Sequence, residues 1–118
     1  MEMTVESTAE LVCVALSGRM DSAGVEKAEA RFFASFASRG VDTLFDLTHV
    51  TLLTSIGLRV LISGAKTVHA RGARVALVAP PGPIRDVLED AALHELMAIA
   101  DDRTAAAAKL RDADRRKS

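Results

Sequence analysis

The residues whose types and spacing suggest chemistry lie between Asp46 and Arg59, on both sides of a serine at position 55. Leu44–Leu47 is apolar with one carboxylate, as expected of a buried strand, and a long helical pattern begins at Thr54-Ser55. Ser and Thr favour helix starts because their side-chain oxygens accept hydrogen bonds from free backbone N–H groups. Those N–H groups and the positive end of the helix dipole also tolerate an anion such as a phosphate.

One chemistry that these residues suggest is catalysis with Ser55 as the nucleophile. His49 in the preceding segment is a candidate base, which would make the chain a small hydrolase. The chain has no Gly-x-Ser-x-Gly elbow and no evident third group to orient the histidine. The three histidines, at 49, 69 and 94, and the single cysteine, Cys13, match no metal-ligand spacing. We therefore predict no catalytic residue, no metal and no cofactor.

The helical pattern after Ser55 shows which way the serine faces. Apolar residues repeat at helical spacing and predict a buried face made of Leu58, Leu61, Ile62, Ala65 and Val68, widened by Ile56 and Val60. Arg59, Ser63 and Lys66 fall on one narrow polar stripe below the serine. Ser55 is therefore predicted to head a solvent-facing stripe that another protein can reach.

The motifs around Ser55 resemble those of the STAS domain, the fold of bacterial anti-sigma factor antagonists, which is also found at the end of sulfate transporters. That family has a strand ending in Asp-Leu, a short loop, and Asp-Ser-Ser/Thr-Gly-Leu opening a helix. The matching stretches here are Asp46-Leu47 and Leu52-Leu53-Thr54-Ser55-Ile56-Gly57-Leu58. Leu16–Asp21 resembles the family's second strand and turn, and Arg71–Val78 resembles the strand after its central helix. The resemblance covers nearly the whole chain in order.

The resemblance implies a regulatory interaction protein, not an enzyme. In anti-sigma factor antagonists the serine at this motif position is phosphorylated, so Ser55 is the expected phosphorylation site. The implied partners are an anti-sigma factor that is also a serine protein kinase, and a serine phosphatase that resets the switch. The residues expected in the partner surface are Asp21, Asp46, Thr54, Ser55, Ile56, Gly57 and Arg59.

The sequence departs from the family at two positions, and alternatives stay open. Thr54 stands where the family usually has Asp, and Ile56 stands where it has Ser or Thr. Thr orients the serine hydroxyl only weakly, so a STAS module without the switch is the runner-up: a scaffold, a transport accessory, or a sensor of a small ligand or nucleotide. Asp21 and Asp46 are equally well explained as turn or cap residues.

Composition restricts the class of protein further. The chain has 118 residues, no Trp or Tyr, and a net charge of −1 with acids and bases mixed, which argues against a nucleic-acid surface. No apolar run approaches the roughly 20 residues of a membrane span, and no signal peptide is visible, so a cytoplasmic protein is expected. A homodimer is compatible with the sequence. We predict one STAS-like domain over 1–113 and a charged tail over 114–118.

The pattern of elements predicts an α/β fold with a mixed, mostly parallel sheet of about five strands and four helices. Strands are expected at 3–5, 11–16, 41–47, 75–78 and 96–99, and Thr48–Thr51 is expected to turn. The first helix should bury Val25, Ala28, Phe32 and Phe36, and the third should bury Ile84, Val87, Leu88 and Ala91. The predicted core consists of Val14, Phe32, Phe45, Leu58, Leu61, Ile62, Val75, Leu77 and Leu88.

Overall fold

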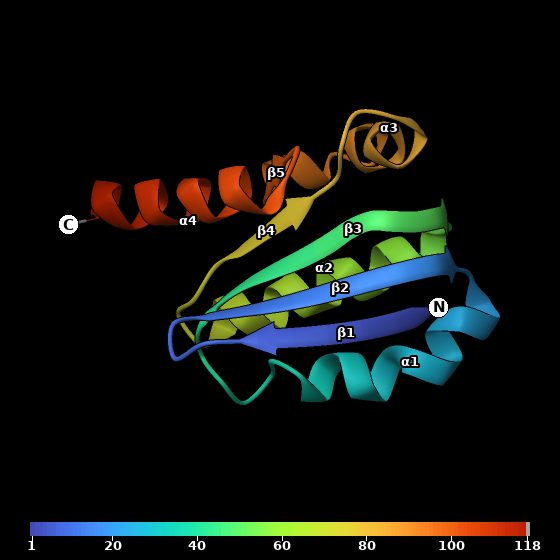
Figure 1. The fold of residues 1–118 in the computed structure, drawn as a ribbon, viewed down its shortest axis with the longest axis horizontal. Coiled ribbons are helices and arrows are strands. Elements are labelled where there is room, and N and C mark those ends of the chain that lie inside the picture. Colours follow the sequence, from blue (N-terminus) through green and yellow to red (C-terminus); the bar gives the residue numbers. More distant parts are fainter. Residues whose placement is uncertain (118) are drawn as a thin grey trace.

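A five-stranded sheet runs through the computed structural model in the order β1-β2-β3-β4-β5 (Figure 1). The structure describes residues 1–117, with side chains up to residue 112. Strand β1 (Glu2–Ser7) pairs antiparallel with β2 (Leu11–Met20), and β2, β3 (Asp42–Leu53), β4 (Val75–Val78) and β5 (Ala98–Ala100) pair in parallel. The predicted mixed, mostly parallel sheet is confirmed.

The helices divide between the two faces of this sheet. Helices α1 (Ser22–Ala34), α2 (Ser55–Ala70) and α3 (Pro83–Asp90) follow successive strands and share one face, as crossovers of one hand between neighbouring parallel strands require. A short 3-10 turn, η1 (Leu93–Glu95), precedes β5. Helix α4 (Arg103–Lys117) packs over β3, β4 and β5 on the other face. The predicted tail, 114–118, lies beyond the described side chains and stays a prediction.

The larger of the two cores lies under α1, α2 and α3. It contains a cluster of four phenylalanines, the buried Phe32, Phe36 and Phe45 and the partly buried Phe33, in which neighbouring ring centroids lie 4.9–5.7 Å apart. Gly64 lets α2 approach this cluster, because a Cβ there would lie 3.0 Å from Cζ of Phe45. The smaller core, under α4, contains Cys13, and burial raises the pKa of its thiol.

The turn predicted at Thr48–Thr51 is wrong, because β3 continues to Leu53. Strand β2 also continues beyond its predicted end to Met20, and the two strands pair to their ends, where Met20 lies opposite Leu53. Thr48, His49 and Thr51 are exposed positions of a strand. Their polarity marked contact with solvent and not a change of chain direction.

The predicted core is largely confirmed. Val14, Phe32, Phe45, Leu61, Val75, Leu77 and Leu88 are all buried, whereas Leu58 and Ile62 are only partly buried. Phe36 is buried, although α1 ends before it, at Ala34. Ala91, expected in the buried face of α3, is exposed because it follows the end of that helix.

Among the described residues no helix is long and apolar enough to cross a bilayer.

Candidate functional site

Ser55 is the first residue of α2 and is exposed. The residue that caps the helix is Thr54, whose backbone is extended and whose Oγ1 accepts a hydrogen bond from the Gly57 amide at 3.4 Å. The same hydroxyl donates to the backbone carbonyl of Met20 at 2.7 Å. Ser55 was a cap candidate in the sequence, and the structure gives that role to its neighbour.

The Ser55 hydroxyl has no hydrogen-bond partner among the described residues. It heads the predicted polar stripe of α2, in which Arg59 and Lys66 are exposed and Ser63 is half-buried. Arg59 likewise has no ion-pair or hydrogen-bond partner within the described part of the chain. The side chains at the head of this stripe are therefore available to another molecule.

The structure places Asp21 at the same end of the sheet as Thr54. Strands β2 and β3 end side by side, and the Thr54 amide and hydroxyl both donate to the carbonyl of Met20, the residue before Asp21. Asp21 caps α1 by accepting from the Gly24 amide at 2.9 Å. The N-termini of α1 and α2 consequently lie next to each other, as expected at the carboxyl ends of parallel strands.

Asp21 is held as a carboxylate. The hydrogen bond from the Gly24 amide, and then the one from Arg19 Nε at 3.1 Å, lower the pKa of Asp21. The Arg19 side chain is 68% exposed, so this ion pair lies at the surface. Asp21 thus adds a fixed negative charge beside the Ser55 end of α2.

Gly57 allows the start of α2 to pack closely against the ends of β2 and β3 beneath this surface. It is buried, and a Cβ at this position would lie 2.8 Å from Cδ1 of Leu53 and 2.9 Å from the carbonyl oxygen of Met20. Only glycine allows α2 to start this close to the ends of β2 and β3. Ile56 is half-buried and packs against the larger core.

Asp46 lies apart from this surface, on the face of the sheet that α4 covers. Its Oδ1 accepts from the Thr48 hydroxyl at 2.6 Å and the Thr48 amide at 3.0 Å, and its Oδ2 accepts from Arg103 Nε at 2.7 Å. Burial raises the pKa of Asp46, but these hydrogen bonds and the Arg103 charge outweigh it, so the pKa is lowered overall. Asp46 therefore holds α4, and none of its contacts supports a place in the partner surface.

Arg103 is the residue of this network that sequence reasoning missed. It is the first residue of α4 and also donates to Glu6 on β1 at 3.3 Å. The sequence contained one indication that Asp46 needs such a residue, because a buried carboxylate requires a hydrogen-bond or ion-pair partner. Spacing did not reveal it, because 57 residues separate Asp46 from Arg103.

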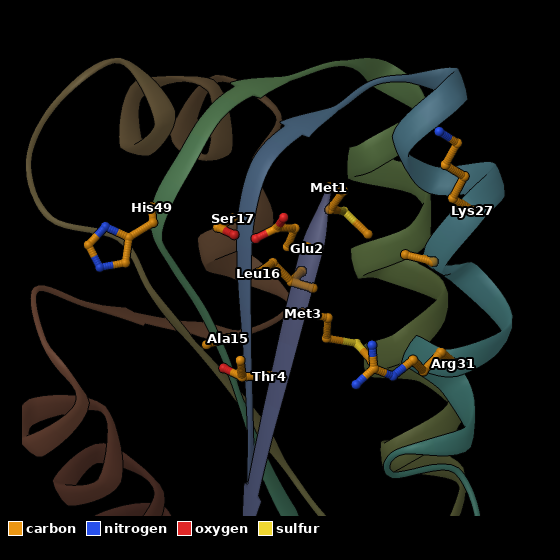
Figure 2. Close-up of a pocket in the computed structure, with 11 residues that line it drawn as sticks. Met1, Glu2, Met3, Thr4, Ala15, Leu16, Ser17, Lys27, Arg31 and His49 are labelled. Atoms are coloured by element: carbon orange, nitrogen blue, oxygen red, sulfur yellow. The ribbon is translucent and has the colours of Figure 1, made fainter.

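The geometry gives no support to the hydrolase hypothesis. His49 lies on β3 opposite Ser17, and Figure 2 shows its ring pointing away from the side on which α1 and α2 lie. No hydrogen bond joins His49 to Ser55 among the described residues. The described residues also contain no group of three His, Cys, Asp or Glu side chains able to hold a metal ion.

Comparison with known proteins agrees with this architecture. The STAS domain model matches residues 2–106. The putative anti-sigma factor antagonist BtrV of Bordetella bronchiseptica is 26% identical over 113 residues, which are 96% of this chain and 97% of that protein.

Solved structures share the fold, and two of them illustrate it. The putative anti-sigma factor antagonist of Thermotoga maritima superposes with a TM-score of 0.82 at 19% identity, over 92% of this chain and 94% of that one. The Bacillus cell fate determinant SpoIIAA in its phosphorylated form superposes with a TM-score of 0.66 at 21% identity, over 88% of this chain and 96% of that one.

Proposed function

The chain belongs to the STAS domain family, and from that premise we propose that it is an anti-sigma factor antagonist switched by phosphorylation of Ser55. Its relatives named as anti-sigma factor antagonists are regulators and not enzymes, in agreement with the predicted lack of catalytic activity. The partner in this proposal is an anti-sigma factor that is also a serine protein kinase. A serine phosphatase restores the unmodified state.

One observation carries the proposal. The Thr54 hydroxyl makes the hydrogen bonds that fix the start of α2, and the adjacent Ser55 hydroxyl is exposed and has no hydrogen-bond partner within the described chain. A hydroxyl without an intramolecular role is free to enter a kinase active site. The phosphorylated form of SpoIIAA, a protein of the same fold, supports the assignment of a phosphate switch to this chain.

The proposed partner surface consists of the exposed and half-buried residues at the start of α1 and α2. Asp21, Thr54, Ser55, Ile56 and Arg59 supply contacts, and Gly57 acts beneath them by allowing close packing. In its unmodified state this surface binds the anti-sigma factor, and the sigma factor is released. Asp46 is left out, since its carboxylate is bound to Thr48 and Arg103.

Phosphorylation changes the charge at the centre of this surface. A phosphoserine adds about −1.5 to −2 charges at neutral pH. Within the free domain that charge is tolerated, because it lies at the positive end of the α2 dipole. In a closed interface it must lose its water without a fitted counter-charge, which weakens the complex.

The test is incubation with the cognate anti-sigma factor kinase and ATP, followed by mass spectrometry of the intact chain and its peptides. We expect one phosphate, located at Ser55, and no phosphorylation of Ser55→Ala. Ser63→Ala is the matched control, since Ser63 lies on the same stripe two turns further along α2, and it should be phosphorylated like wild type. Phosphate at Thr54 or Ser63 would contradict the proposal.

A further inference from the structure

The outer edge of β1 is open. Strand β1 is the first in the sheet order, and within the described chain no strand pairs with its other side. The Thr8 amide donates to the carbonyl of Leu11, which marks these two residues as a hydrogen-bonded pair. Since such pairs alternate along an antiparallel ladder, Glu2, Thr4 and Glu6 face β2, and the N–H and C=O groups of Met3, Val5 and Ser7 face outward.

A groove runs along this edge and is lined from both faces of the sheet. It has a volume of about 530 Å³; Met1, Met3 and Leu16 line it on the face that α1 covers, and Glu2, Thr4, Ala15, Ser17 and His49 line it on the other face. Figure 2 shows Met1 and Met3 directed toward α1, on which Lys27 and Arg31 lie. Val5, on the same face of β1 as Met3, is 39% exposed and extends the apolar strip along the edge. A β-strand placed here would find both backbone partners and an apolar floor.

Positive charge lines the α1 side of the groove. Lys27 and Arg31 are exposed, and neither has an ion-pair or hydrogen-bond partner among the residues whose side chains are described. Arg39 donates to the carbonyl of Thr8 at 2.8 Å, which places a third cation at the hairpin end of β1. The cations therefore follow the open edge along much of its length.

We propose that the β1 edge is a docking site for an extended acidic segment of a protein partner. The segment adds a sixth strand through the outward backbone groups of Met3, Val5 and Ser7. Because side chains alternate along a strand, every second residue of the segment faces α1 and presents carboxylates to Lys27 and Arg31. The intervening side chains are small and uncharged, as they lie on the face that carries Glu2.

The charges disfavour a second copy of this chain as the occupant. Two β1 strands paired antiparallel about Thr4 would place Glu2 of each copy opposite Glu6 of the other, and like charges directly opposite are destabilising. Pairing about Val5 sets Glu6 opposite Thr4 and avoids that conflict, but it keeps the two α1 helices on the same face. The cations of the two α1 helices would also meet on one face. An acidic partner satisfies the same cations without either conflict.

The test uses the full chain and a defined probe, the acetylated and amidated heptapeptide TETVTET, whose Glu and Val share one face. In two-dimensional amide NMR titrations, hydrogen exchange of the Met3, Val5 and Ser7 amides should slow on binding. Exchange at Glu2, Thr4 and Glu6 should change little, because these amides already bond to β2. The lysine analogue TKTVTKT should bind about tenfold more weakly, since its charges repel Lys27 and Arg31.

Charge reversal makes the test specific. Lys27→Glu/Arg31→Glu should weaken TETVTET binding about tenfold and improve TKTVTKT binding. The control Lys66→Glu/Arg71→Glu reverses two exposed cations, one on α2 and one directly after it, and should leave both peptides unaffected. Ser55→Asp should also leave TETVTET binding unchanged, which separates this site from the proposed switch.

Three results would overturn the proposal. They are the absence of TETVTET binding at millimolar concentration, protection of the β1 amides without alternation, and equal binding by Lys27→Glu/Arg31→Glu and wild type. Concentration-dependent protection of Met3, Val5 and Ser7 in the absence of peptide would identify a second copy as the occupant instead.

Discussion

At the residue scale, the neighbouring hydroxyls at the start of α2 have separate roles. Thr54 both donates to the Met20 carbonyl and accepts from the Gly57 amide, so it ties the end of β3 to the end of β2 while it caps the helix. The Asp usual at this position in the family accepts hydrogen bonds but, when ionised, has no proton to donate. The departure from the family pattern therefore supplies a structural link that an ionised Asp does not.

The double role of Thr54 is testable by substitution. Thr54→Val keeps the shape but removes both hydrogen bonds, and we expect it to lower the free energy of unfolding by about 1–2 kcal/mol. Thr54→Ser keeps donor and acceptor and should stay within about 0.5 kcal/mol of wild type. Urea unfolding of the three proteins gives the comparison. Equal stability of Thr54→Val and wild type would show that these hydrogen bonds contribute nothing.

Ser55 should respond to substitution in function and not in stability. Because Thr54 is the cap, Ser55→Ala should change the free energy of unfolding by less than about 0.5 kcal/mol, below the roughly 1 kcal/mol of a lost cap. Ser55→Asp places a charge at the favourable end of α2 and should fold at least as well as wild type. Partner titrations should nevertheless show weaker binding by Ser55→Asp and normal binding by Ser55→Ala. Wild-type affinity of Ser55→Asp would rule out a charge switch.

At the scale of elements, the buried face of α2 is the part that periodicity predicts best. Leu61 is fully buried and Leu58 only partly, although both belong to the predicted stripe. Leu61→Ala should cost about 2–5 kcal/mol, as buried Leu-to-Ala changes do, and Leu58→Ala should cost less. Thermal or urea unfolding of the two variants checks the orientation of the helix. A larger loss for Leu58→Ala would mean that α2 is rotated about its axis relative to this structure.

Sequence reasoning succeeded where local chemistry decides and failed where pairing decides. The start of α2 at Thr54-Ser55 and the apolar run of β4 both follow from neighbouring residues. The length of β3 does not, because Thr48 and His49 are polar yet stay in the strand through pairing with the extended β2. The prediction for Phe36 was right in one respect and wrong in another. Helical periodicity predicted its burial correctly, but the chain around it is a turn and not a helix.

The residues of the candidate site were likewise predictable only where a local sequence pattern identifies them. Ser55, Arg59 and the Asp21 cap were predictable from local patterns. The adjacency of Asp21 and Thr54 was carried over from the family and has its physical cause in the paired ends of β2 and β3. The partnership of Asp46 with Arg103 depends on how α4 returns across the sheet, and no short-range pattern contains that information.

At the scale of the whole molecule, the two faces of the sheet are held by different means. The face under α1, α2 and α3 buries a large aliphatic and aromatic core. Among the α4 residues whose side chains are described, Ala106 and Leu110 are the two that are buried in the smaller core. The ion pair of Arg103 with buried Asp46 is therefore a large part of what fixes α4.

Replacing Asp46 by Asn tests this anchoring. The variant keeps an acceptor for Thr48 but loses the charged partner of Arg103, so at pH 7 it should lower the free energy of unfolding by about 1.5–3 kcal/mol. Asp101→Asn is the matched control, because it removes a 64% exposed carboxylate that pairs with Arg85. It should cost under about 1 kcal/mol, as exposed pairs do.

The pH dependence of that loss identifies its origin. Folding lowers the pKa of Asp46, so the stability due to its charge is fully present above the unfolded pKa of about 3.9 and is lost as the pH falls through the lower, folded value. Urea unfolding of wild type and Asp46→Asn should show a constant difference between about pH 7 and pH 5 and a shrinking one below about pH 4. A difference that stays constant through this lower range would mean that the cost comes from altered packing beneath α4, since packing does not titrate with Asp46.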